Sequence, residues 1–201
     1  MTLRLVVALA SAYLLGSIPT AYLLVKRLKH LDIRTIGSGN VGATNVARAT
    51  GLWAGLAVFL IDLAKGFIAV QGIAPSMLRP LTAEGRLLCG LLAVVGHCFP
   101  IFLQFRGGKG VATTIGVLAG AVPLIAFFCL VVWGACFAIW RYVSIASIAA
   151  AGMIPLGQAI THQRAEAMGI GVALAVLVIA RHRSNFVRLL HGQEHRVGRR
   201  R

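Results

Sequence analysis

The chain has 201 residues, of which 58% are hydrophobic and only 12% are charged. Soluble domains are usually about 45 to 50% apolar and about 25% charged, so this composition excludes an ordinary soluble globule and a disordered chain. Twenty Lys and Arg against five Asp and Glu give a formal net charge of +15. We expect so hydrophobic and basic a chain to bind lipid headgroups and small anions, and we expect it not to bind nucleic acid.

The chain has six apolar runs, and five of them approach or exceed the roughly 20 helical residues that cross a hydrocarbon layer about 30 Å thick. They lie at 5–25, 52–74, 87–105, 111–140, 142–160 and 167–180. The first run is longer than a typical signal-peptide core and no polar domain follows it. We therefore expect it to stay in the mature protein as a membrane segment and not to be cleaved off as a signal peptide. The fourth run is too long for one ordinary span and contains Pro123, which favours a break there. The chain is therefore expected to cross six or seven times.

The Lys and Arg residues favour seven crossings, because such residues stay at the cytoplasmic ends of short loops. If the run 111–140 crossed once, the seven arginines between Arg181 and the C-terminus would lie outside. If it breaks at Pro123 and crosses twice, fifteen of the twenty basic residues face the cytoplasm. The sequence thus predicts an all-α polytopic membrane protein of about seven helices, with its N-terminus outside and its C-terminus cytoplasmic.

This topology brings four polar stretches to the cytoplasmic face, which predicts one site at the membrane boundary. They are 37–48, 107–114, 141–147 and 181–194. The first reads GSGNVGATNVAR and contains G-x-G-x-x-G, but no strand precedes it and no β-α-β unit follows, which excludes a dinucleotide fold. Its glycines can turn N–H groups toward an anion, and Arg48 can add a charge. A flexible loop with a helix cap is the other interpretation.

Two charges lie within the run 52–74. Asp62 and Lys65 are three residues apart, so they can pair across one turn of a helix. Ionisable residues within a membrane span are rare and have a role in function or assembly. Because no other polar motif surrounds them, we expect a structural ion pair that fixes helix packing.

The stretch 105–114 reads FRGGKGVATT, with three glycines around Lys109 at an expected helix start. Such a segment can cradle phosphate, although it lacks the first Gly and the hydroxyl residue of a Walker A motif. A positively charged turn at the membrane interface is the alternative.

The stretch 181–188 reads RHRSNFVR, and helical spacing puts His182, Asn185 and Arg188 on one face. A structural histidine and headgroup-binding arginines are the alternative interpretation. With only two aspartates, the chain offers little scope for a Ser-His-Asp triad or a carboxylate metal cluster. Its four cysteines have neither zinc nor disulfide spacing. We therefore expect no metal and no cofactor.

Several motifs in a fixed order carry a resemblance to a known family. They are GSIP at 16–19, the stretch 37–48, D-x-x-K-G from Asp62, G-H-x-x-P from Gly96, GGKGVAT at 107–113, and H-x-x-N-x-x-R-L-x-x-G-x-E from His182. Over nearly its whole length the chain resembles the acyl-phosphate-dependent glycerol-3-phosphate acyltransferases of bacterial membranes, the PlsY family. The resemblance implies one membrane-embedded acyltransferase domain over 1–195, a basic cytoplasmic tail over 196–201, and a place in the bacterial cytoplasmic (inner) membrane.

The reaction that the resemblance implies is transfer of a fatty acyl group from acyl phosphate to the 1-hydroxyl of sn-glycerol 3-phosphate. The products are 1-acyl-sn-glycerol 3-phosphate (lysophosphatidic acid) and inorganic phosphate, in the first step of phospholipid synthesis. Acyl phosphate is already activated, so no acyl-enzyme nucleophile is needed. The protein must hold two phosphates, align the hydroxyl and stabilise the developing oxyanion. The soluble enzyme that makes acyl phosphate is a further expected partner.

The resemblance also implies the site residues. The expected catalytic residues are His182, Asn185 and Ser38. Glycerol 3-phosphate is expected to contact Ser38, Arg48, Lys109, His182 and Asn185. Acyl phosphate is expected at Gly37, Gly39, Asn40, Gly42, Asn45, Gly107, Gly108, Gly110 and Thr113. Glu194 and Arg188 are expected to support these residues without contacting substrate themselves, with Glu194 orienting an arginine. Either His182 or a phosphate oxygen of the substrate takes the proton, and the sequence does not separate the two.

Two other function classes stay open. Seven spans with a basic vestibule could form a transporter or channel for a small phosphorylated anion. Clustered arginines could instead gather anionic lipid on a non-catalytic scaffold. The transporter is disfavoured because no inverted repeat is evident and because the polar motifs are expected at one face instead of the midplane.

Overall fold

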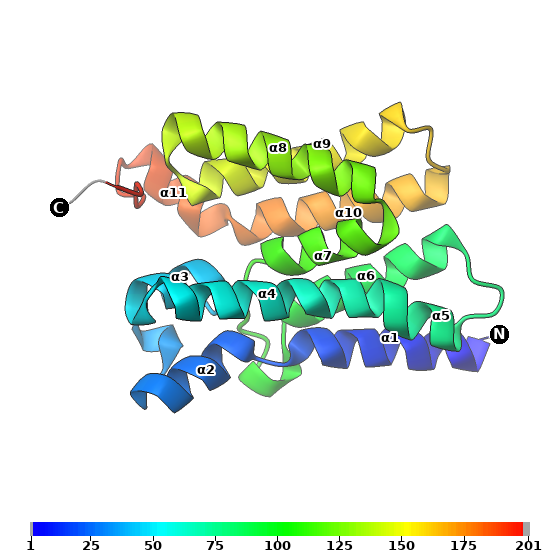
Figure 1. The fold of residues 1–201 in the computed structure, drawn as a ribbon, viewed down its shortest axis with the longest axis horizontal. Helices are drawn as coiled ribbons and strands as arrows, with labels where there is room; N and C mark the ends of the chain where they lie inside the picture. Colours follow the sequence, from blue (N-terminus) through cyan, green and yellow to red (C-terminus); the bar gives the residue numbers. More distant parts are fainter. Residues whose placement is uncertain (1, 199–201) are drawn as a thin grey trace. The chain divides into compact units, whose positions relative to one another are not determined.

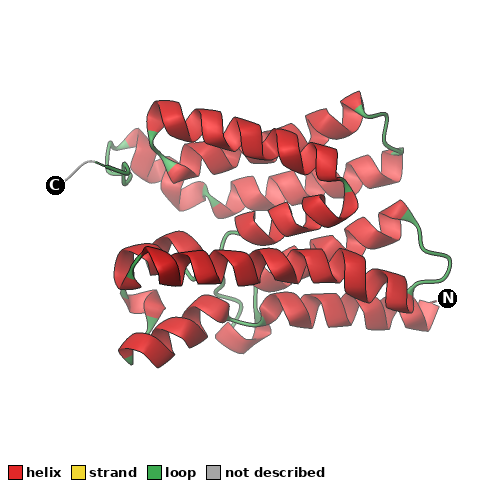
Figure 2. Cartoon of the chain, in the orientation of Figure 1, coloured by secondary structure: helices red, strands yellow, loops and turns green. Residues whose placement is uncertain are grey.

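The computed structural model describes residues 2–198, which are helical with connecting loops and contain no strand (Figure 2). This confirms the predicted all-α class. The chain divides into two compact units, unit 1 over Met1–Ala121 and unit 2 over Val122–Arg201. The division falls where the run 111–140 is interrupted: α7 (Val111–Ala121) ends before Val122, and α8 (Pro123–Trp140) starts at Pro123. Proline suits the first turn of a helix, where its missing N–H is not needed.

Unit 1 is built around two pairs of packed helices, α1 against α6 and α4 against α7 (Figure 1). The short helix α3 also packs on α4. The elements of unit 1 are α1 (Thr2–Ser17), α2 (Thr20–Lys29), η1 (Ile33–Thr35), α3 (Ala43–Thr50), α4 (Leu52–Ile68), η2 (Ala69–Ile73), α5 (Ala74–Met77), α6 (Ala83–Cys98), η3 (Ile101–Leu103) and α7.

The first apolar run is not the continuous helix that its hydropathy predicts. It breaks at Ile18 and Pro19 into α1 and α2, and α2 continues to Lys29. Proline cannot donate to the preceding turn and its ring displaces that turn's carbonyl, which explains the break. Just before it, Gly16 lets α1 touch α6 directly, since an added Cβ would collide with the backbone carbonyl of Ala93.

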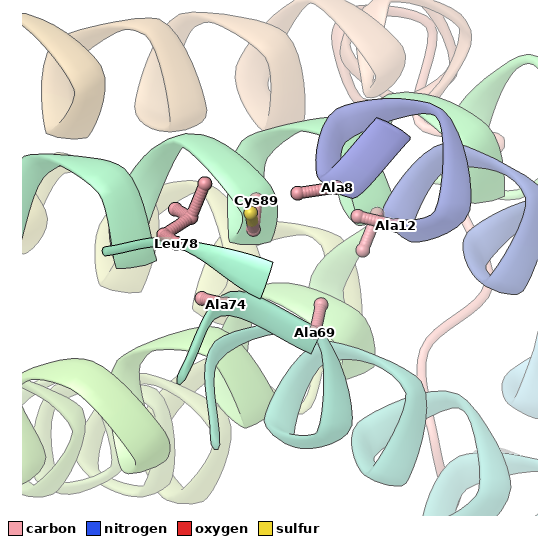
Figure 3. Close-up of a cluster of buried hydrophobic side chains, with 7 residues drawn as sticks. Ala8, Ala12, Ala69, Ala74, Leu78 and Cys89 are labelled. Atoms are coloured by element: carbon pink, nitrogen blue, oxygen red, sulfur yellow. The ribbon is translucent and has the colours of Figure 1, made fainter. Parts of the chain in front are cut away.

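Small residues bring the helices of unit 1 close together. Figure 3 shows Ala8 and Ala12 of α1 beside Ala69, Ala74 and Cys89, in a cluster that is fully buried apart from Leu78 at its edge. Van der Waals contact is the main force between helices in lipid, because the lipid tails are as apolar as the side chains. The alanines therefore fix the spacing of α1, α6 and the segment that follows α4.

The contact between α4 and α7 depends on a glycine from each helix. A Cβ on Gly66 of α4 would collide with the carbonyl of Thr113, and one on Gly116 of α7 would collide with the carbonyl of Leu63. The two backbones therefore touch without intervening side chains, as small-residue motifs permit in membrane helices.

Unit 2 is formed by four helices, of which α9 packs on both α8 and α10. They are α8, α9 (Val143–Ile160), α10 (Ala165–Arg181) and α11 (Arg183–Leu190). Polar side chains join neighbouring helices: Trp133 Nε1 donates to Ser147 Oγ at 3.2 Å, and Gln158 Nε2 donates to the carbonyl of Ala167 at 2.8 Å.

Five segments among the described residues are long and apolar enough to cross a membrane. They are Leu3–Lys29, Leu52–Met77, Ala83–Leu103, Pro123–Trp140 and Val143–Ile160. The pair α10 and α11, bent by 49°, makes a sixth if it is counted as one span, whereas α7 is an apolar helix of only 11 residues. The expected seven crossings, with the N-terminus outside, stay a prediction.

The glycine contact gives a stability test. Replacing Gly116 by Ala forces a methyl group into the backbone of α4, and overpacking of this kind costs about 1–3 kcal/mol. Gly152, on an exposed part of α9 with no atom within 4 Å of an added Cβ, is the control. We expect G116A to lower the thermal unfolding midpoint in detergent, and G152A to leave it unchanged or raise it. Equal midpoints for G116A and G152A would show that the close contact does not stabilise unit 1.

Candidate active site

The first glycine loop, residues 37–42, is folded around the side chain of Asn45. Asn45 is only 1% exposed; its Oδ1 accepts from the backbone N–H of Ser38 at 3.1 Å, and its Nδ2 donates to the carbonyls of Ile36 at 2.9 Å and Asn40 at 3.1 Å. Gly37 and Gly39 have φ of +60° and +68°, a backbone conformation that glycine adopts without strain. The loop is therefore a defined turn that leads into α3.

This geometry gives Asn45 a structural role. Its amide is used inside the loop and holds the loop's shape, while its expected contact with acyl phosphate stays a prediction. The N–H of Gly39 is also used, since it donates to the carbonyl of Ile36 at 3.0 Å. Ser38 and Arg48, by contrast, are exposed: Ser38 lies in the loop, and Arg48 lies one turn beyond Asn45 on α3.

The second glycine loop, residues 107–110, is laid against the end of α6. The N–H of Gly107 donates to the carbonyl of Cys98 at 3.2 Å, and the N–H of Gly108 donates to the carbonyl of His97 at 3.1 Å. These two N–H groups thus build the loop, and the expected contact of Gly107 and Gly108 with acyl phosphate stays a prediction. Lys109 follows at once and is half-buried.

Thr113 lies outside this loop. It is fully buried in the first turn of α7, in the contact with Gly66 of α4, and its expected contact with acyl phosphate stays a prediction. Gly42 and Gly110 immediately precede α3 and α7. Both glycine loops therefore end at helix N-termini, where the helix dipole and the first N–H groups favour an anion.

His182 marks the bend between α10 and α11 in unit 2. Its ring is 2% exposed, and Nδ1 lies 2.8 Å from the carbonyl of Val178. Because a carbonyl only accepts, this contact assigns the proton of the neutral ring to Nδ1 and the lone pair to Nε2. The backbone carbonyl of His182 also accepts a hydrogen bond from the backbone N–H of Asn185, at the start of α11.

Glu194 joins three side chains of unit 2. Its Oε1 accepts from Asn185 Nδ2 at 2.8 Å and from Ser144 Oγ at 3.1 Å, while its Oε2 accepts from Arg188 Nε at 2.8 Å. Burial alone would raise the pKa of the Glu194 carboxyl, but hydrogen bonds from Asn185 and Arg188, the charge of Arg188 and the Ser144 hydroxyl hold it below its ordinary value of 4.5. Glu194 thus orients Asn185 as well as an arginine, and the bond to Ser144 reaches α9.

The Asp62–Lys65 pair has polar neighbours that the sequence analysis missed. Lys65 Nζ lies 2.6 Å from Asp62 Oδ1 and donates to the carbonyl of Ile18, at the α1–α2 break, also at 2.6 Å. His97 Nδ1 lies 3.7 Å from the same Asp62 oxygen. The predicted Asp62–Lys65 ion pair is therefore confirmed, whereas the premise that no other polar group surrounds it is wrong. The G-H-x-x-P motif was the available signal, because it places a histidine at the end of an apolar run.

The expected site residues fall in both units. Unit 1 holds Ser38, Arg48 and Lys109 beside the two glycine loops, and unit 2 holds His182 and Asn185 with the Glu194 network. Cationic side chains next to helix N-termini can bind phosphate, and a neutral imidazole can accept a proton near neutral pH. Among residues 2–198, no group of three His, Cys, Asp or Glu is arranged to hold a metal ion.

A protein-family model described as glycerol-3-phosphate acyltransferase matches residues 6–192. Among the relatives, the glycerol-3-phosphate acyltransferase of Gloeobacter violaceus is 42% identical over 191 residues, which cover 94% of this chain and 93% of that protein. The protein of the same name from Aquifex aeolicus is 43% identical, with 92% and 95% of the two chains covered. Glycerol-3-phosphate acyltransferase 2 of Moorella thermoacetica is 44% identical, with coverage of 96% and 97%.

Two crystal structures of PlsY (YgiH), an integral membrane glycerol 3-phosphate acyltransferase, have similar folds. The glycerol 3-phosphate form is 41% identical with a TM-score of 0.90, and 96% of each chain is covered. The lysophosphatidic acid form is 40% identical with a TM-score of 0.87, and 96% of this chain and 95% of that chain are covered.

The Glu194 network predicts a pH-dependent contribution to stability. Because the pKa of Glu194 is lower in the folded protein, the contribution is complete above about pH 4.5 and is lost as the pH falls through the lowered folded pKa. At neutral pH we expect E194Q to destabilise the protein by about 1.5–3 kcal/mol, the range for hydrogen bonds to a charged group. Thermal unfolding in detergent measures this difference, which should shrink in acid.

The control for E194Q is Q193A, because Gln193 is the exposed neighbour and only its backbone N–H, bound to the carbonyl of Arg188, takes part in the fold. Q193A should leave the unfolding midpoint unchanged at both pH values. A difference between E194Q and the wild-type protein that stays constant into acid would contradict the assigned role of the carboxylate.

Proposed function

The chain belongs to the glycerol-3-phosphate acyltransferase family, and from that premise we propose the reaction that it catalyses. A fatty acyl group moves from acyl phosphate to the 1-hydroxyl of sn-glycerol 3-phosphate, giving 1-acyl-sn-glycerol 3-phosphate and inorganic phosphate. The hydroxyl oxygen forms the new bond to the acyl carbon, the bond from that carbon to the phosphate oxygen breaks, and the hydroxyl proton passes to a base. The protein is a multi-pass membrane acyltransferase.

The observation that supports the acceptor and the product most strongly is the pair of similar solved structures. One structure of PlsY (YgiH) is a glycerol 3-phosphate form and the other is a lysophosphatidic acid form, which are the two sides of a single acyl transfer. Acyl phosphate as the donor is supported by the chemistry of the site, because an activated anhydride needs positioning and charge neutralisation and no covalent intermediate.

We assign the phosphate contacts to the cations beside the glycine loops. Arg48 and Lys109 neutralise substrate phosphate, and Ser38 hydrogen-bonds glycerol 3-phosphate. Gly37, Asn40, Gly42 and Gly110 contact acyl phosphate, the last two at helix N-termini. Gly39, Gly107 and Gly108 shape the backbone instead of donating to the substrate.

We assign the acceptor hydroxyl to His182 and Asn185 in unit 2. The Nδ1 contact with Val178 sets the tautomer in which Nε2 of His182 accepts the proton, and a phosphate oxygen of the substrate is the alternative base. Glu194 fixes the amide of Asn185, so that one orientation of that side chain is presented. We further place the protein in the bacterial cytoplasmic (inner) membrane with its site at the cytoplasmic face, where the soluble enzyme that makes acyl phosphate can deliver it.

The role of His182 can be separated from its role in the fold. H182A should abolish transfer of labelled acyl groups by purified protein, since removing a general base typically costs about 10²- to 10⁴-fold in rate. H191A is the control, because the His191 ring is exposed but makes the same kind of contact, from Nδ1 to the carbonyl four residues earlier at 2.8 Å. A folded H182A that transfers at near-normal rate would remove His182 from the mechanism.

The same assay in vesicles tests the transporter alternative, because flux of labelled phosphate ester without product would favour it.

Lys109 is expected to bind the negatively charged phosphate of glycerol 3-phosphate through its ammonium group. K109M should raise KM for glycerol 3-phosphate by about 10- to 100-fold, because a charge-assisted contact to phosphate is lost. The control is R106Q, since Arg106 is an exposed basic residue three positions earlier. Steady-state kinetics that show equal KM values for K109M and R106Q would argue against a phosphate contact by Lys109.

A further inference from the structure

A buried group of ionisable side chains in unit 1 has no part in the transfer chemistry described above. It consists of Asp62 and Lys65 on α4 and His97 at the end of α6. The side chains of Asp62 and Lys65 are 3% and 4% exposed, and that of His97 is 8% exposed. Removing charges from water is costly, and a buried ion pair is often no more stabilising than well-packed apolar residues. Its presence therefore calls for a role in geometry.

The group connects two interruptions of the helices. On one side, Lys65 Nζ holds the carbonyl of Ile18, which lies at the break between α1 and α2 (Figure 1). On the other side, Asp62 Oδ1 lies 3.7 Å from His97 Nδ1, which is too long for a hydrogen bond but gives an ion pair when the imidazole is protonated. The buried hydroxyls of Ser17 and Thr20, which have no protein partner, line a water-sized cavity together with Asp62 and His97.

The second glycine loop lies directly on His97. Gly108 packs on the imidazole so closely that an added Cβ would collide with Nε2, and its N–H donates to the carbonyl of the same histidine. Gly107 touches the His97 carbonyl in the same way. The position of the ring therefore sets the path of the backbone immediately before Lys109.

We propose that Asp62, Lys65 and His97 form a positioning network that holds the second glycine loop so that Lys109 meets substrate phosphate. Lys65 fixes the Asp62 carboxylate, Asp62 fixes the His97 ring, and the ring supports Gly108. A buried polar network can specify a single arrangement of the elements that it joins, in addition to the apolar packing around it. The network consists of positioning residues, and this assignment rests on the proposed function of Lys109.

The test removes both charges together, so that no unpaired charge stays buried. The variant D62N/K65M should fold, because it leaves neither partner charged. We expect its KM for glycerol 3-phosphate to rise by about tenfold or more with a smaller change in kcat, since a displacement of about 1 Å at a binding group can cost up to about 100-fold. H97Q should show the same change in KM and add little to D62N/K65M, because both act on the same loop.

The control is Q71M. Gln71 follows α4 in the same unit and donates from Nε2 to the carbonyl of Gly120 at 2.6 Å, so Q71M also removes a bond between helices but lies away from the loop. Its KM should stay within about twofold of the wild-type value, as is usual for independent sites. If D62N/K65M is folded and its KM also stays within about twofold, the proposal is overturned.

A second measurement is independent of catalysis. The amides of Gly107 and Gly108, which are bonded to the end of α6, should exchange with deuterium at least about tenfold faster in D62N/K65M than in Q71M or the wild-type protein. Unchanged exchange would overturn the network whether or not the enzyme is active. If the wild-type protein gives no acyl transfer but the amide exchange responds as expected, the proposed function fails while the network holding the loop stands. If D62N/K65M does not fold, H97Q provides both measurements.

Discussion

In an apolar medium, backbone N–H and C=O groups that are freed where a helix is interrupted must find partners within the protein. In this chain those partners are specific. Lys65 donates a hydrogen bond to the carbonyl of Ile18 at the α1–α2 break. The side chain of Asn45 hydrogen-bonds two carbonyls and the N–H of Ser38 in and beside the first glycine loop. The end of α6 binds the N–H groups of the second loop, and His182 binds Val178 at the bend between α10 and α11. Each polar loop is thereby given a single shape.

The same need for partners within the protein explains how a chain with few charged residues can support phosphate chemistry. Most of the basic residues are expected to set the membrane topology, and the acids are too few to neutralise substrate-binding cations. Glu194 and Asp62 are used inside networks, where they orient Asn185, Arg188, Lys65 and His97. Lys109 is presented on a rigid loop next to the N-terminus of α7, and Arg48 lies in the last turn of α3, the helix that follows the first glycine loop.

The sequence predicted the helical class, the interruption at Pro123 and the polar stretches, because hydropathy and proline act locally. It did not predict the break at Ile18 within a continuous apolar run, since a GSIP segment can bend a helix or end it. It also predicted that Asn45, Gly107 and Gly108 contact acyl phosphate. Whether an N–H or an amide turns inward depends on φ and on distant partners such as His97, and no local pattern contains that information. Glu194 was expected to bind an arginine, but its bonds to Asn185 and Ser144 require the packing of α9 and α11.

The proposed reaction depends on direct transfer without an acyl-enzyme intermediate, and pre-steady-state release of phosphate tests this step. Purified protein in lipid nanodiscs is mixed with radiolabelled acyl phosphate, first without and then with glycerol 3-phosphate. Direct transfer predicts no burst of phosphate and no acylated protein before the acceptor is added, and then 1-acyl-glycerol 3-phosphate and phosphate in equal amounts. A burst equal to the enzyme concentration, or phosphate release without acylated product, would contradict it.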